Sequence, residues 1–176
     1  MPILPILKYG NPVLRQPGKK VTRVDASLRK LAADMIETMH AAEGIGLAGP
    51  QIGKSLSIFV TDVSPIEEGA SPMVFLNLEI LESEGNAPYT EGCLSIPGVS
   101  AEVYRPERIM VRYMDLNREF HEGMATGILA RVIQHELDHV HGKLFIDYLD
   151  KETLESFRPI LAELEAGDHK EIANSV

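Results

Sequence analysis

The residues best suited to chemistry lie in one short stretch of the chain, Gln134-His135-Glu136-Leu137-Asp138-His139. Residues four apart lie on the same face of a helix, so His135 and His139 can present two imidazoles to one metal ion. Glu136 can project beside that ion, where a carboxylate could move protons to and from a bound water. The pattern therefore predicts a metal-dependent hydrolase.

A third metal ligand has to come from elsewhere in the chain, because catalytic zinc and similar ions usually take three protein ligands. The only thiol is that of Cys93, in the segment Glu91-Gly-Cys-Leu-Ser-Ile-Pro97. A thiolate is a strong soft donor, and metal binding would drive its deprotonation. Spacing alone does not bring Cys93 to the two histidines. The residues by themselves leave two interpretations open, a metal ligand or a small buried hydrophobe.

The other polar candidates are weaker. His40, His121, His141 and His169 have no partners at convincing ligand spacing, so they are predicted to lie at the surface or in loops. Asp138 falls within the helical motif but points away from its two histidines. We therefore expect a solvent-exposed or salt-bridged Asp138.

The helix that carries the motif is predicted from about Met124 to His141, and Gly142 can end it in a left-handed conformation. Its apolar residues fall into two groups. The first should face the core, and the second lies on the side of the histidines, where it could line an apolar pocket. The core group is Leu129, Ile133 and Leu137, and the pocket group is Ile128 and Val132.

Apolar periodicity predicts two further helices and several short strands. An N-terminal helix should begin near Asp25 and end before the glycine-rich segment 44–51, whose glycines could merely end that helix. A C-terminal helix is expected over 151–165, with a kink or break at Pro159. Strands are predicted over 55–63, 73–81, 99–104 and 108–115, and around Phe120 after a turn at 117–118. This order predicts an α+β fold, with small mixed or antiparallel strands packed around the central helix.

Length and composition set the wider limits. A chain of 176 residues predicts a single domain spanning 1–176. A formal charge of −9 argues against broad binding to nucleic acid or to an anionic membrane. The apolar opening 1–7 is short and broken by Pro2 and Pro5, so it is expected to be neither a signal peptide nor a membrane span. The single cysteine excludes an internal disulfide and fits a reducing compartment, with the cytoplasm as the expectation.

Three segments in order resemble the signature segments of the peptide deformylase family. They are Gly44-Ile-Gly-Leu-Ala-Gly-Pro-Gln51, Glu91-Gly-Cys-Leu-Ser95 and Gln134-His-Glu-Leu-Asp-His139. The resemblance extends from Lys8 to Asp147 and therefore covers most of the chain. One position departs from the family pattern, because Gly49 stands where the family usually has alanine. Loss of that methyl group is expected to loosen the loop that carries Gln51 without inactivating the site.

The resemblance implies a role for each residue of the site. The metal ligands would be Cys93, His135 and His139, the general acid/base Glu136, and the oxyanion donors Gln51 and the backbone N–H of Leu94. A metal-bound water would attack the formyl group on the N-terminal methionine of new polypeptides, releasing formate. Iron(II) is the physiological ion expected from bacterial members, and zinc, nickel or cobalt could also occupy such a site.

The substrate contacts are further hypotheses. A methionine side chain needs an apolar slot, and close approach of the peptide backbone needs small residues. The candidates are Ile45, Ile128 and Val132 for the slot, Gly46 and Gly92 for the backbone, and Arg105 for a substrate contact or, equally, a salt bridge. The implied partners are formylmethionyl nascent peptides, with transient ribosome proximity and without stable nucleic-acid or membrane binding. The expected location is the bacterial cytosol.

Two rival functions remain open from the sequence. A metalloprotease that cleaves internal peptide bonds would act on unformylated peptides and depend little on Cys93. A binding protein that keeps the fold and the metal would hold formyl-methionyl peptides without releasing formate. The second rival is disfavoured because Gln51, Glu136 and all three predicted metal ligands are present.

Overall fold

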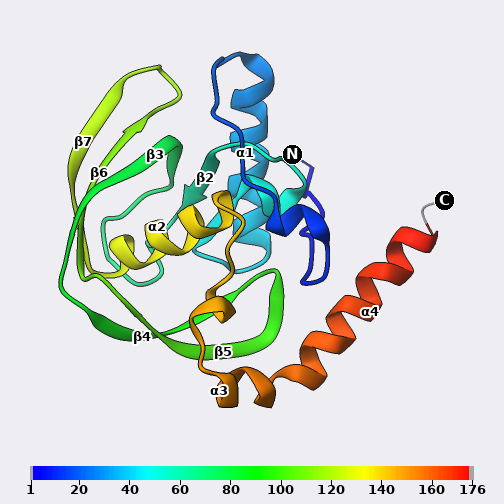
Figure 1. Cartoon of the computed structure of the whole chain (residues 1–176). Coiled ribbons are helices and arrows are strands. Elements are labelled where there is room, and N and C mark those ends of the chain that lie inside the picture. Colours follow the sequence, from blue (N-terminus) through cyan, green and yellow to red (C-terminus); the bar gives the residue numbers. More distant parts are fainter. Residues whose placement is uncertain (1, 175–176) are drawn as a thin grey trace.

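The computed structural model describes residues 2–174, with side chains described through residue 167. Its main sheet is antiparallel and has five strands in the order β1-β2-β3-β6-β7 (Figure 1). These strands are Gly46–Ala48, Ile58–Thr61, Met73–Glu84, Arg108–Met114 and Phe120–Thr126. The strands predicted from periodicity are therefore present, although β2 is shorter and β3 longer than expected.

A separate antiparallel pair consists of β4 (Ala87–Cys93) and β5 (Ile96–Arg105). The sequence predicted most of β5 but not β4. Because β4 ends at Cys93, this hairpin determines where the only thiol lies. Figure 1 shows the hairpin below the main sheet, on the side of α3.

Helix α2 (Gly127–Val140) crosses the middle of the molecule (Figure 1). One face packs on the sheet, where Ile133 and Leu137 join a cluster with Phe59, Phe75 and Ile109. Burial of this apolar face from water fixes the rotation of the helix and turns its other face toward β4. The prediction that Ile133 and Leu137 face the core is confirmed.

The ends of α2 differ in how well they were predicted. The expected start near Met124 is wrong, because residues 120–126 pair with β6 and the helix begins at Gly127. The predicted end is confirmed, since Gly142 follows the helix with a φ of 76°, a left-handed conformation that favours glycine. A Cβ at Gly142 would also lie 2.5 Å from the carbonyl oxygen of Arg15.

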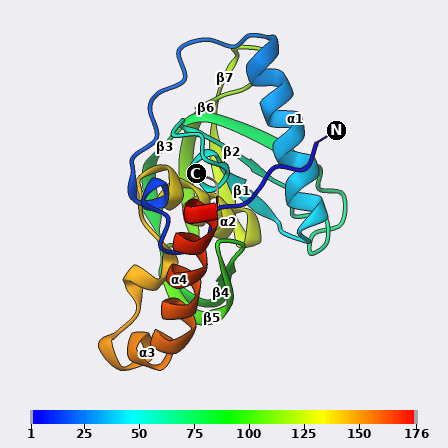
Figure 2. The ribbon, with the colours of Figure 1, turned by 90° about the vertical axis from the view of Figure 1, so that its right-hand side faces the viewer.

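The N-terminal helix follows its expected position, whereas the C-terminal helical region continues to Asn174, beyond its predicted end near Glu165. Helix α1 (Ala26–Ala41) begins after Asp25, whose carboxylate accepts a hydrogen bond from the N–H of Leu28 at 2.9 Å. The predicted C-terminal helix is broken into α3 (Lys151–Ser156) and α4 (Arg158–Asn174), and Pro159 lies in the first turn of α4. Figures 1 and 2 show α4 extending along the outside of the molecule from the end where the β4–β5 hairpin lies.

The α+β fold predicted from the sequence is confirmed, and all pairings between the named strands are antiparallel. No helix in the described part of the chain combines the length and the apolar character that a membrane span requires.

Candidate metal centre and active site

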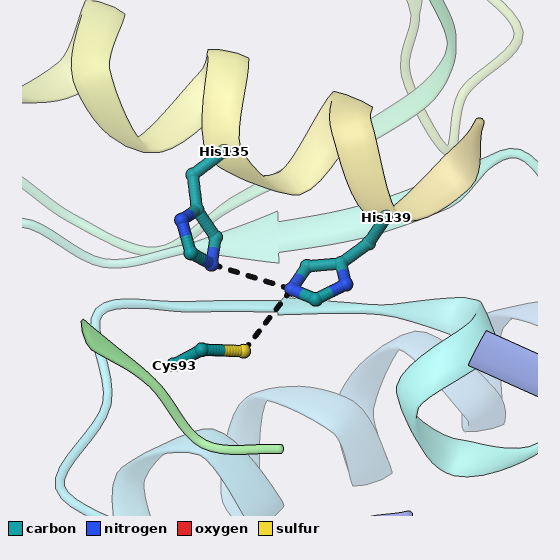
Figure 3. Close-up of side chains that lie close together, drawn as sticks. All are labelled: Cys93, His135 and His139. Carbon is teal, nitrogen blue, oxygen red and sulfur yellow. Dashed lines mark hydrogen bonds between the residues drawn. The ribbon is translucent and has the colours of Figure 1, made fainter. Parts of the chain in front are cut away.

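Helix α2 and strand β4 bring together three side chains that could hold a metal ion, those of Cys93, His135 and His139 (Figure 3). The Sγ of Cys93 lies 3.3 Å from the Nε2 of His139, and that nitrogen lies 3.3 Å from the Nε2 of His135. All three ligand atoms lie within 4.8 Å of one another. The structure thus brings the only thiol of the chain next to the two imidazoles of the helical motif.

The spacing of these atoms fits a shared metal ion. Around a tetrahedral ion with metal–nitrogen and metal–sulfur distances of about 2.0 Å and about 2.3 Å, two nitrogens lie about 3.3 Å apart and a nitrogen and a sulfur about 3.5 Å apart. The observed separations involving the Nε2 of His139 are close to these values. One thiolate and two imidazoles also form a soft to borderline donor set that suits late transition-metal ions.

Glu91 orients the first histidine of the site. Its Oε1 lies 2.9 Å from the Nδ1 of His135, so that Nδ1 carries the proton toward the carboxylate and Nε2 is left to face Cys93 and His139. Burial opposes ionisation of Glu91, but the hydrogen bonds from His135 and Arg105 outweigh it and lower its pKa from 4.5 to about 2. Sequence reasoning missed Glu91, although it lies two residues before Cys93 in the same motif.

Two arginines complete the environment of Glu91. Arg105 donates to both carboxylate oxygens at 2.6 and 2.9 Å, and the Nη1 of Arg131 donates to Oε2 at 2.9 Å. Arg105 also donates to Asp138 at 2.8 Å, so the predicted salt bridge of Asp138 is confirmed. Arg105 is buried and is not among the residues that line the cavity, so its position favours the ion-pair role over the substrate contact.

The buried carboxylate of Glu91 predicts a defined pH response. Its folded-state pKa lies below the ordinary value, so the ionised group stabilises the fold above pH 4.5, and this contribution is lost as the pH falls from 4.5 toward 2. We expect Glu91→Gln to lower the free energy of unfolding by roughly 3 kcal/mol at pH 7 and by less than half as much at pH 3. Urea unfolding at both pH values measures this difference, with the exposed Glu37→Gln as the control. An equal loss at both pH values would contradict a role for the charge.

Glu136 follows His135 in α2, its side chain is buried, and it is 4% exposed. Burial raises its pKa from 4.5 to about 7, which suits a group that has to accept and return a proton near neutral pH. Its Oε2 has no hydrogen-bond partner within the described residues. Gly46 makes room for this carboxyl group, because a Cβ there would lie 2.5 Å from the Oε1 of Glu136.

Gln51 is buried next to Cys93, and hydrogen bonds at both ends of its amide group fix the orientation of that group. Its Oε1 accepts from the N–H of Ala48 at 2.9 Å, and its Nε2 donates to the Oγ of Ser95 at 3.1 Å. The same Nε2 lies 3.6 Å from the Sγ of Cys93, so the donor end of the amide faces the three-residue cluster. Ser95 was not singled out from the sequence, and its place in the Glu91–Ser95 motif was the only available signal.

A cavity of about 480 Å³ opens beside these residues. Ile45, Gly46, Gly92, Ile128 and Val132, the predicted substrate contacts other than Arg105, all line it. Gln51, Leu94 and Glu136 line it as well, so the predicted oxyanion donors and the predicted general acid/base face one space. The cavity therefore joins an apolar slot to a group of polar and ionisable residues.

The effect expected at Gly49 is corrected by the structure. No space for a methyl group remains there, because a Cβ would lie 2.7 Å from the carbonyl oxygen of Lys54 and 3.0 Å from that of Leu56. The N–H of Lys54 also donates to the carbonyl oxygen of Gly49 at 2.9 Å. The backbone of 54–56 packs directly on Gly49, so the glycine permits a tight loop and does not loosen it.

We therefore expect Gly49→Ala to destabilise the protein by about 1–3 kcal/mol, because backbone atoms would have to move to accept the methyl group. Thermal or urea unfolding of the variant measures this loss. Gly123→Ala is the matched control, since no atom lies within 4 Å of a Cβ at that position. If Gly49→Ala were as stable as wild type, the backbone of 54–56 would be able to move aside without a loss in the free energy of unfolding.

The remaining histidines lie away from this site. His40 and His121 are exposed and lie 2.7 Å and 2.6 Å from the carboxylates of Asp62 and Asp115, and His141 is exposed at the end of α2. The side chain of His169 lies outside the described residues. Asp115, Glu119 and His121 form a second group of ligand atoms, but the latter two are exposed, and Asp115 is already hydrogen-bonded to backbone N–H groups and to His121.

The fold and the site together define a hydrolase: a buried carboxyl group and two members of a possible metal-ligand set, Cys93 and His135, line a cavity with an apolar slot. The family model described as polypeptide deformylase matches residues 3–155. The chain therefore belongs to the polypeptide deformylase family and is an enzyme of that family.

Individual relatives agree with this assignment. The chain is 51% identical over 152 residues to a peptide deformylase from Mesorhizobium japonicum, covering 86% of each chain. It is 43% identical to one from Chlorobaculum parvum, covering 94% of this chain and 89% of that protein. Among solved structures, a plant peptide deformylase superposes with a TM-score of 0.90 at 32% identity, covering 96% of this chain and 92% of that chain. The Synechococcus elongatus peptide deformylase in complex with actinonin has a TM-score of 0.84 at 42% identity, covering 90% of this chain and 88% of that chain.

Proposed function

We propose that this protein removes the formyl group from the N-terminal formylmethionine of nascent polypeptides and releases formate. The observation that carries the proposal is the convergence of Cys93, His135 and His139 beside the buried carboxyl group of Glu136. Family membership supports the same reaction, because the curated relatives are named peptide deformylases. The apolar slot next to these residues suits an unbranched methionine side chain.

Cys93, His135 and His139 are the residues that would hold the metal. A divalent cation at this point would act as a Lewis acid and would lower the pKa of a water molecule toward neutrality. Glu91 supports this ligand set, because its hydrogen bond to the Nδ1 of His135 directs Nε2 toward the other two ligands. We infer iron(II) as the physiological ion, with zinc, nickel or cobalt as alternatives that the same ligands would accept.

The protein residues have separate tasks in the proposed reaction. Glu136 accepts a proton from the attacking water and later delivers it to the leaving amine. The Nε2 of Gln51 and the backbone N–H of Leu94 donate hydrogen bonds to the oxygen that becomes negative as the formyl carbon turns tetrahedral. The bond between Ser95 and Gln51 keeps the amide donor turned toward that oxygen before the substrate arrives. Preorganised donors of this kind typically contribute about two to three powers of ten in rate.

The slot proposal makes a testable prediction. Ile128 and Val132 line the cavity from α2 on the same side as His135. We expect Ile128→Phe to raise the KM for formyl-methionyl peptides about tenfold, because the larger ring occupies the space of the methionine side chain while the reacting groups stay in place. Steady-state kinetics measure this change, with the exposed Ile3→Phe as the control. Unchanged kinetics would refute the lining role.

Formylmethionyl nascent peptides are therefore the partners that we propose. Encounter with such substrates would bring the enzyme transiently to the ribosome in the bacterial cytosol. The formal charge of −9 gives the chain no general attraction to RNA, so the proposal includes no stable complex with nucleic acid.

The decisive experiment measures formate release from a short formyl-methionyl peptide under anaerobic conditions with iron(II) supplied. The proposal expects turnover of this peptide and none of the same peptide without its formyl group. Cleavage of internal bonds in the unformylated peptide would support the metalloprotease alternative. Binding of the formylated peptide by metal-loaded protein without formate release would support the binding-protein alternative.

A further inference from the structure

The N-terminal segment from Leu4 to Tyr9 lies against the segments that carry the proposed oxyanion donors (the dark blue segment in Figure 1). The N–H of Leu7 donates to the carbonyl oxygen of Gln51 at 2.7 Å, and the N–H of Tyr9 donates to that of Ser95 at 2.8 Å. At its other end, the N–H of Leu4 donates to the Oγ1 of Thr38 in α1 at 2.9 Å. We call residues 4–9 the N-terminal strap, because this one segment connects α1 with both donor segments.

Within the strap, the side chain of Lys8 makes a polar contact with one of the donor residues. Its Nζ donates to the carbonyl oxygen of Leu94 at 3.3 Å. Lys8 makes no ion pair within the described residues, although acidic residues outnumber basic ones by 26 to 17 in the chain. Lys8 is half-buried as a residue, and its ammonium group donates to a backbone carbonyl although the chain is rich in carboxylates, which differs from the exposed, solvated lysine usual at a protein surface.

This contact acts on the turn that holds the second oxyanion donor. Leu94 lines the cavity, whereas Lys8 does not, so the ammonium group holds Leu94 from outside the substrate space. The neighbouring carbonyl group of Ser95 is held by Tyr9, and the Oγ of Ser95 accepts from Gln51. Three consecutive strap residues therefore fix both donor segments relative to each other.

We propose that Lys8 is a positioning residue for deformylation, acting through the carbonyl group of Leu94 to align the oxyanion donors. This inference rests on the proposed function. Oxyanion donors accelerate a reaction only when they already point at the developing charge, and small displacements are costly in rate. Lys8 does not touch the substrate, so its loss should affect the transition state and leave substrate binding nearly unchanged.

The test compares Lys8→Met, which removes the donor and keeps the aliphatic stem, with Lys8→Arg, which keeps a charged donor. Lys20→Met is the matched control, since Lys20 is exposed and its side chain makes no hydrogen bond or ion pair within the described residues. We expect Lys8→Met to lower kcat about tenfold with KM within about twofold of wild type. Metal content and the unfolding midpoint should stay at wild-type values, and Lys8→Arg should recover most of the rate.

Hydrogen exchange provides a readout that does not depend on activity. In Lys8→Met the backbone amides of 93–96 should exchange about tenfold faster than in wild type, while Lys8→Arg and Lys20→Met should not change them. A wild-type kcat in Lys8→Met, an equal rate loss in Lys8→Arg, or loss of metal in Lys8→Met would each overturn the inference. Absence of formate release from the wild-type enzyme would overturn the proposed function together with this inference. An active wild type beside an unaffected Lys8→Met would overturn this inference alone.

Discussion

Replacement of Glu136 by glutamine is expected to lower kcat for formyl-methionyl peptides by about three powers of ten, with the metal retained. The amide has nearly the same size as the carboxyl group and fits the space left by Gly46, so the fold and the three proposed metal ligands should remain in place. It cannot accept a proton from the attacking water or deliver one to the leaving amine. General acid/base groups typically contribute about two to four powers of ten in rate.

Formate release and elemental analysis of the purified variant measure both parts of this expectation. Glu37→Gln is the control for loss of one carboxylate, because Glu37 is exposed on α1, away from the cavity. Glu136→Ala should lose turnover equally, again with the metal retained. More than a tenth of wild-type turnover in Glu136→Gln would exclude the proposed acid/base role. Loss of the metal would instead mean that Glu136 supports the ligand set.

The helices were the most predictable part of the fold. The apolar stripe of α1 and its Asp25 cap, like the stripe of α2 and the glycine after it, are local signals that survive in the folded chain. The start of α2 was predicted too early because residues near Met124 suit a helix as well as a strand. Residues 120–126 form a strand because they pair with β6, and this tertiary contact cannot be read from the local sequence.

The strands β1 and β4 were not predicted, for two different reasons. Strand β1 has only three residues and lies inside the glycine-rich segment. Glycine is disfavoured in strands, so the local composition does not indicate one. Strand β4 contains Pro88 and Gly92, both disfavoured in strands, and most of its residues are exposed, so apolar alternation is absent. Its pairing with β5 supplies the stability that its own sequence does not indicate.

The candidate site also contains residues that local sequence spacing predicts and residues that only the folded chain brings together. The spacing of His135 and His139 follows from helix geometry alone, so both could be paired before any fold was known. Cys93 lies 46 positions from His139, and only the end of the β4–β5 hairpin brings it there. Glu91 and Arg105 look like ordinary charged residues in the sequence. Their burial in one ion-pair network behind His135 is a property of the folded chain.

The contacts of the segment 91–95 also help to distinguish the rival functions, because both ends of this segment bind other residues of the candidate site. Glu91 and Ser95, at the two ends of the motif, contact His135 and Gln51. A metalloprotease that used only the helical motif would depend little on Cys93, since its third ligand would lie elsewhere. The cysteine therefore distinguishes the proposed function from this rival more sharply than the histidines do.

Replacement of Cys93 by serine is expected to reduce bound metal to under about a tenth of an equivalent per chain after dialysis, and to lower turnover at least about a hundredfold. A serine hydroxyl stays protonated near neutral pH and is a poor donor for a late transition metal, so two imidazoles alone would have to hold the ion. Elemental analysis and formate release measure the two losses.

The comparison with Glu136→Gln gives this prediction its control, because the two variants should separate metal binding from catalysis. Glu136→Gln should keep the metal and lose turnover, whereas Cys93→Ser should lose the metal and regain part of its turnover in excess iron(II). Full metal content and near wild-type turnover in Cys93→Ser would remove the thiolate from the ligand set. The small buried hydrophobe would then be the better interpretation of Cys93, and a metalloprotease with another third ligand would gain support.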